Sequence, residues 1–161
     1  MKRLGILFAA FLSASLLAAP AASAAPVKPA TSLRVEIDRA RARDGVTFDR
    51  VHEIVNGARA LDRRARGGKA PIALHLRALG PKALLPMLEL VAFGAPGVTP
   101  EGRAAARLDV IEAIGLLRDP RALPTLSSML EREREYAGAR AVSEAIARLD
   151  TEDAATRLAA A

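Results

Sequence analysis

An internal repetition in the second half of the chain constrains its fold more than any single motif does. Residues 72–91 align with residues 110–129 at an offset of 38, which pairs Leu76 with Ile114. The pattern returns at an offset of 32, which pairs Ile114 with Ile146. A Gly/Pro-rich insertion between the first two copies accounts for the difference between the offsets. Repetition on this scale is typical of proteins in which copies of one small unit stack on one another.

Capping residues predict that each unit is a pair of helices. Thr99 is suited to cap a helix with Pro100 at its first position, and the apolar spacing carries this helix to about Leu117. Asp119 and Pro120 provide the same kind of start for a second helix. Because such a hairpin cannot bury its apolar face alone, we expect the pairs to stack.

One further helix is predicted upstream, over residues 47–66. Thr47 is placed to cap it, and Val46 is placed to meet Val51 as a hydrophobic staple. Apolar residues at three- and four-residue spacing give this helix a single buried stripe. The stripe consists of Val51, Ile54, Val55, Ala58 and Leu61.

The central unit resembles the HEAT repeats. Residues 113–126 contain the end of one helix, an Asp-Pro pair that starts the next helix, and leucines that face inward from that second helix. This arrangement is similar to a short HEAT-like repeat of the kind also found in phycobilisome lyase subunits. Residues 76–86 form a second copy and residues 145–150 a weaker one, so the resemblance covers residues 70–158. It implies an all-α, short right-handed α-solenoid of antiparallel helix pairs and a general role in holding other proteins. Lyase activity is not implied, since no motif for bilin attachment is present.

Residues 1–24 have the three parts of a secretory signal peptide, namely a basic start, an apolar stretch and a small-residue cleavage site. The apolar stretch, residues 4–19, is shorter than the about 20 residues needed to span a bilayer. We therefore expect cleavage between Ala24 and Ala25 and a mature chain that is periplasmic or secreted. No later apolar run predicts a transmembrane segment in the mature chain.

Two regions are expected after cleavage. Residues 25–46 form a linker, and two prolines hold its start extended. The spacing of Leu33 and Ile37 fits one face of a short helix, so a short helix and disorder are both open alternatives for the rest of the linker. Residues 47–161 form the HEAT-like domain.

Residues that carry chemistry are scarce. The chain has no Cys, which excludes disulfides, thiolate metal sites and a Cys nucleophile. His52 and His75 lack further ligands at helical spacing, and Ser127 and Ser128 lack a nucleophile motif, so they are interpreted as structural or surface residues. We predict no catalytic, metal-binding or cofactor-binding residue and no cofactor, and therefore no enzyme.

Charge supplies one alternative function. Residues 25–100 carry a net charge of +6 and residues 101–161 a net charge of −2. A basic patch lies at the end of the predicted upstream helix and consists of Arg59, Arg63, Arg64, Arg66 and Lys69. It could bind an anionic lipid headgroup or another polyanion, whereas nucleic acid is disfavoured by export and by the low aromatic content of 3%.

The leading hypothesis is an exported, non-enzymatic scaffold that binds another protein through its second helices, with an accessory subunit of an envelope enzyme as a further alternative. The outward residues predicted to touch the partner are Lys82, Glu89, Arg121, Ser128, Glu131 and Arg132. The C-terminal end has few large apolar residues to cover the last helix pair, so two explanations of how the stack is completed are open. Either the 47–66 helix completes the stack from the other side, or a partner or second copy covers the C-terminal end.

Overall fold

The computed structural model describes residues 30–58, 72–149 and 151–159, and every regular element in these ranges is helical. The α-helices are α1 (Ala30–Arg43), α2 (Gly45–Asn56), α4 (Ile72–Ala78), α5 (Leu84–Ala92), α6 (Pro100–Leu117), α7 (Leu123–Arg132), α8 (Tyr136–Ala147) and α9 (Glu152–Ala159). Short 3₁₀ helices η1 (Pro81–Ala83) and η2 (Pro120–Ala122) precede α5 and α7. The all-α prediction is confirmed for this part of the chain.

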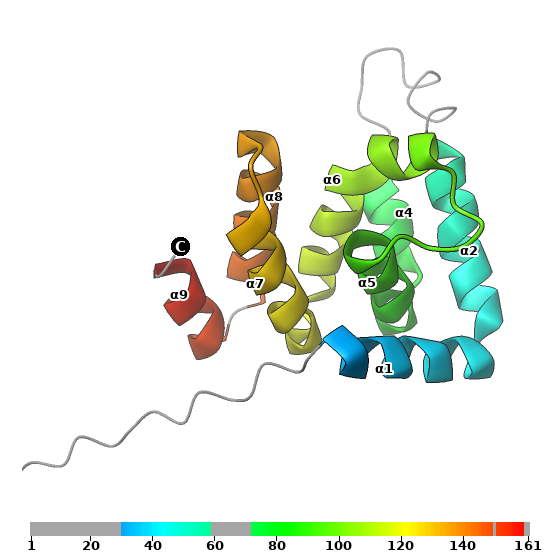
Figure 1. Cartoon of the computed structure of the whole chain (residues 1–161), viewed down its shortest axis with the longest axis horizontal. Coiled ribbons are helices and arrows are strands. Elements are labelled where there is room, and N and C mark those ends of the chain that lie inside the picture. The colour runs from blue at the N-terminus through cyan, green and yellow to red at the C-terminus, as the bar shows by residue number, and fades with distance from the viewer. Residues whose placement is uncertain (1–29, 59–71, 150, 160–161) are drawn as a thin grey trace, which may run out of the picture.

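Along the chain, α4, α6 and α8 are followed by α5, α7 and α9, respectively (Figure 1). The first helices of the pairs, α4, α6 and α8, pack in that order, with α6 between the other two. Each second helix packs on the first helix of the next pair, so that α5 contacts α6 and α7 contacts α8.

Equivalent positions of the repeat share one core. Leu76, Ile114 and Ile146, aligned by the two offsets, are each 0% exposed. Leu88 and Leu126, aligned in the second helices, are 1% and 0% exposed. These five aliphatic side chains, which the spacing predicts to face inward, are therefore all buried.

Both helix starts of the central unit are confirmed. The Thr99 hydroxyl accepts a hydrogen bond of 3.0 Å from the backbone N–H of Gly102 at the start of α6. The Asp119 carboxylate accepts one of 3.0 Å from the backbone N–H of Arg121. The Asp119 cap opens η2, so one 3₁₀ turn precedes α7.

The start of α2 differs from the prediction. The helix begins at Gly45 and its cap is Asp44, whose carboxylate accepts hydrogen bonds from the Thr47 hydroxyl at 2.8 Å and the Thr47 backbone N–H at 3.3 Å. Thr47 thus lies inside the helix, because the earlier Asp44 satisfies the free N–H groups. The predicted staple between Val46 and Val51 is also wrong, since Val46 is 80% exposed while Val51 is fully buried.

The segment predicted as a linker contributes a packed helix. Helix α1 runs across the ends of α2 and α5 (Figure 1), and Ile37 in its middle is 0% exposed. Leu33 packs against the core from the same helix face. Of the two alternatives for this stretch, the helix is the one found, and the packed helices begin well before the boundary expected at 46/47. Burial of one apolar stripe against α5 explains why this short amphipathic stretch folds.

At the other end, α9 packs on α8. Its Ala154 is 2% exposed, and Leu158 is partly buried against the core. The signal peptide, its cleavage site between Ala24 and Ala25, and the basic patch lie outside the described residues. Among the helices in the described ranges, none has the length and apolar character needed to cross a membrane.

Candidate protein-binding surface

The structure separates the six residues predicted to contact a partner. Lys82 and Arg121, which come from η1 and η2, line the same depression. Glu131 and Arg132 are exposed at the end of α7, and Ser128 is half-buried one turn earlier. The Arg132 guanidinium donates a hydrogen bond of 2.9 Å to the Ser128 carbonyl oxygen, which holds it against its own helix.

The sixth residue, Glu89, does not face outward. Its side chain is buried beneath α1, where the Arg41 guanidinium forms an ion pair with it. The same guanidinium lies 4.6 Å from the centre of the Phe48 ring, a cation–π arrangement. The prediction that Glu89 is exposed is therefore wrong. Its partner Arg41 lies 48 residues earlier in the chain, on a helix that the sequence did not indicate would pack over Glu89.

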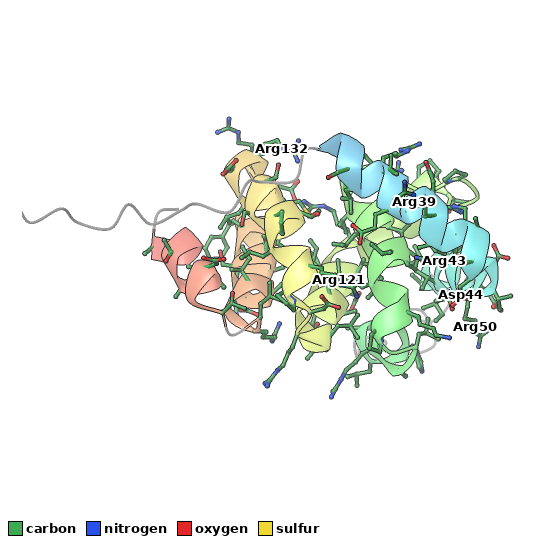
Figure 2. The ribbon with its side chains drawn as sticks, turned by 90° about the horizontal axis from the view of Figure 1, so that it is seen from below. Arg39, Arg43, Asp44, Arg50, Arg121 and Arg132 are labelled. Atoms are coloured by element: carbon green, nitrogen blue, oxygen red, sulfur yellow. The ribbon has the colours of Figure 1, made fainter. Side chains whose placement is uncertain are left out.

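The depression that brings Lys82 and Arg121 together has a volume of about 550 Å³. Ala40, Arg43, Asp44, Phe48, Pro81, Lys82, Leu85 and Arg121 line it. Its cations come from three separate elements, namely α1, η1 and η2, and Ala40, Phe48, Pro81 and Leu85 give it an apolar part. Arg43, Asp44 and Arg121 lie on the same face of the molecule (Figure 2).

Carboxylates hold two of the three cations in place. The Arg121 guanidinium donates to both Asp119 carboxylate oxygens, at 3.0 Å from Nε and 2.7 Å from Nη2, and this contact lowers the pKa of Asp119. The Lys82 ammonium lies 3.9 Å from Asp44. Hydrogen bonds from Thr47, and then the Lys82 charge, lower the pKa of Asp44. Both carboxylates are therefore ionised at neutral pH.

The lining keeps an excess of positive charge. It contains three cations and one carboxylate, and Arg43 has no ion pair within the described ranges. An acidic group over a partly apolar lining is the ligand chemistry that complements this arrangement.

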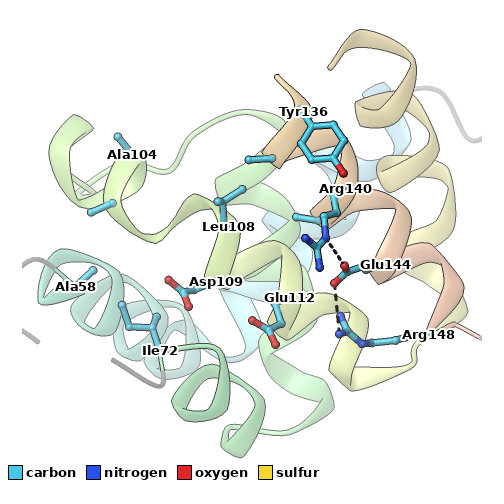
Figure 3. A pocket seen from close by; sticks show the side chains of 13 residues that line it. Ala58, Ile72, Ala104, Leu108, Asp109, Glu112, Tyr136, Arg140, Glu144 and Arg148 are labelled. Atoms are coloured by element: carbon cyan, nitrogen blue, oxygen red, sulfur yellow. Dashed lines mark hydrogen bonds and ion pairs between the residues drawn. The ribbon is translucent and has the colours of Figure 1, made fainter. Parts of the chain in front are cut away.

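A larger depression, of about 590 Å³, lies on the first helices instead (Figure 3). Ala104 and Leu108 of α6 and Tyr136 of α8 line it, and Leu108 and Tyr136 are 41% and 82% exposed. Its α8 side carries ion pairs in which Glu144 accepts from Arg140 at 2.8 Å and faces Arg148 at 3.8 Å. This groove lies away from the second helices, on which the sequence predicts the contact residues. Apolar residues of α6 outside its buried stripe, such as Leu108, were the available signal for this groove.

Residues interpreted as structural behave in different ways. His52 is 8% exposed and its Nε2 has no hydrogen-bond partner, whereas His75 is exposed on α4. Ser127, expected on the helix surface, is half-buried with its Oγ buried and unbonded. In the ranges that the structure describes, no three His, Asp or Glu side chains gather into a group that could hold a metal ion.

No protein-family model matches this chain, and neither a curated protein nor a solved structure matches it.

Proposed function

We propose that this chain is an exported, non-enzymatic scaffold of HEAT-like helix pairs that holds an acidic segment of a partner protein. The observation that carries the proposal is the convergence of Arg43, Lys82 and Arg121 from three elements on one partly apolar depression. Charged groups at an interface of this kind steer association and fix its register.

The helical framework supports the proposed scaffold function because it holds the binding surface in place before a partner binds. Arg121 lies on η2, whose cap Asp119 accepts a hydrogen bond from the Arg121 backbone N–H, and the Lys82 ammonium lies 3.9 Å from Asp44, the cap of α2. A preformed surface loses little side-chain and loop entropy on binding, which leaves more of the interaction energy for affinity. The repeat register and the signal-peptide pattern of residues 1–24 support the solenoid and export parts of the proposal.

The arrangement of charges suggests how a segment would bind. A partner carboxylate is best placed next to Arg43, which has no other ion pair in the described part of the chain, and within reach of the fixed Arg121 guanidinium. An adjoining apolar side chain would cover Phe48 and Leu85 in the apolar part. Asp44 would repel a second carboxylate beside Lys82, so the proposal requires spaced rather than contiguous acidic residues.

The test is site-specific crosslinking in the periplasm. A photoreactive residue replaces Pro81, which is exposed and lines the depression without contributing a charge, in the mature chain. We expect a discrete adduct with an acidic polypeptide, and this adduct should be lost when Arg43→Glu is added. Arg77→Glu on α4 is the matched control, because Arg77 is exposed and lies outside the depression. Higher salt should weaken the adduct, since screening shortens the reach of the charges.

Two outcomes would overturn the proposal. One is an adduct that persists unchanged in the Arg43→Glu protein. The other is the absence of any discrete adduct together with binding to anionic vesicles that disappears when Arg63, Arg64 and Arg66 are neutralised. That second result would assign the function to the basic patch instead.

A further inference from the structure

A separate cavity of about 540 Å³ lies where the end of α5 meets α2 and the start of α6. One part of its lining is apolar and consists of Val55, Leu90, Val91, Phe93 and Val110, which form the apolar wall. None of these residues lines the depression described above. A volume of this size is within the usual range for pockets that take small molecules, about 300–1,000 Å³.

Two arginines of α6, Arg103 and Arg107, interrupt the apolar lining. The Arg107 guanidinium is already paired with Glu133, whose side chain is 8% exposed. Arg103 is exposed and has no carboxylate partner in the described ranges. A third cation, Arg34 of α1, lies 5.2 Å over the ring of Phe93, one of the wall residues. The surroundings of the cavity therefore hold more positive than negative charge.

The loop after α5 is shaped around Arg103. Gly94 has φ +70°, a conformation that favours glycine, and a Cβ at this position would overlap the Arg103 guanidinium. Gly94 therefore meets two requirements at once, the turn and the space for the guanidinium. The absence of a side chain at Gly94 thus leaves room for the Arg103 guanidinium at the cavity.

We propose that this cavity binds an amphiphilic monocarboxylate of the fatty-acid type, with the tail along the apolar wall and the carboxylate on Arg103. The wall favours an aliphatic tail because its burial removes apolar surface from water. A planar guanidinium matches a carboxylate with two parallel hydrogen bonds. Arg103 is the one lining cation without a carboxylate partner in the described ranges, so a ligand with a single negative charge is the best match.

The experiment measures displacement of a dansylated undecanoic acid from the mature chain, which has no Trp to disturb the dansyl signal. Octanoate should displace the probe, and 1-octanol, with the same tail and no charge, should do so at least about tenfold more weakly. Arg103→Gln should reduce octanoate affinity by about tenfold and leave the weak octanol binding unchanged.

Two further variants separate this role from a structural one. Gly94→Ala should weaken octanoate binding in the same way, because it displaces the Arg103 guanidinium without removing it. Arg77→Gln, outside the cavity, should bind like the unaltered chain. Circular dichroism establishes that each variant is folded. Equal affinity for octanoate and octanol, unchanged octanoate binding in Arg103→Gln, or no probe binding by the folded chain would each overturn the proposal.

Discussion

At the scale of single residues, the side chains beneath α1 show how burial changes chemistry. Arg41 and Glu89 pair across the α1–α5 contact, while His52 of α2 is buried nearby with an unbonded Nε2. Burial, and then the Arg41 charge, lower the pKa of His52 below its usual 6.5, outweighing the opposite effects of Glu89 and Asp49. His52 is therefore neutral in the folded protein at neutral pH.

This depressed pKa predicts a pH-dependent stability. The unfolded chain protonates His52 near pH 6.5, whereas the folded chain does so only at lower pH. The unfolded state thus binds more protons as the pH falls below about 6.5, and the free energy of unfolding should decrease by at most about 1.4 kcal/mol per pH unit from this group. Urea unfolding between pH 7 and pH 5 measures it.

His52→Gln should flatten that part of the profile because it removes the titrating group. His75→Gln is the control, since His75 is exposed on α4. A profile that keeps its full slope in the His52→Gln protein would refute this assignment.

A second prediction at this scale concerns Gly115 of α6, which lies against Ala145 of α8. A Cβ at Gly115 would lie 2.7 Å from the Ala145 Cα, so Gly115→Ala must push the helices apart. We expect a loss of about 1–3 kcal/mol in the free energy of unfolding, despite the better helix propensity of Ala. Gly45→Ala is the control, because nothing lies within 4 Å of its added Cβ. Equal stability of the two variants would contradict the close approach.

At the scale of helices, α1 depends on one buried ion pair as well as on Ile37. Glu89 has a side chain that is only 4% exposed, while Arg41 is 32% exposed. Taking the arginine away leaves a carboxylate without a partner in an apolar contact, which costs more than the pair itself contributes. The packing of α1 on α5 should therefore be weakened when only one of Arg41 and Glu89 is replaced, and weakened much less when both are replaced by apolar residues.

A double-mutant cycle tests this asymmetry. Arg41→Met alone should lower the free energy of unfolding by about 3 kcal/mol. Adding Glu89→Leu should restore most of that stability, because both new side chains are apolar and similar in volume. Chemical denaturation of the four proteins gives the coupling energy. Additive losses in the double variant would show that the pair does not act as a unit.

At the scale of the whole molecule, α6 lies at the centre of the helix contacts and α9 lies at their edge. Helix α6 contacts α2, α4, α5 and α8, whereas α9 packs chiefly on α8. Stability in such an arrangement is expected to decrease toward the ends, since a terminal helix opens without disturbing the middle.

Hydrogen exchange should follow this order. Amides of α6 should be the most protected and those of α9 should exchange faster by a factor of roughly 100 or more. Mass spectrometry over a range of protein concentrations is the measurement. Protection of α9 that equals α6 and increases with concentration would favour the alternative in which a second copy covers the C-terminal end.

A feature of this fold could be predicted from the sequence when the residues that produce it lie close together in the chain. The spacing of Leu76, Ile114 and Ile146 was enough to place them in the core, and Thr99 and Asp119 marked two helix starts, because these signals act over a few residues. Of the predicted contact set, only Lys82 and Arg121 meet in one depression, since outward positions on separate helices are related only by packing.

The sequence by itself determined the helical class, the burial of the recurring aliphatic residues and the caps Thr99 and Asp119, all of which depend on local periodicity and short-range hydrogen bonds. Only the tertiary structure decided that α1 docks on α5, that Glu89 is buried, and that Arg43 joins Lys82 and Arg121 at one depression. These outcomes depend on contacts between residues about 40 or more positions apart, and a residue pattern carries no record of which helix face meets which.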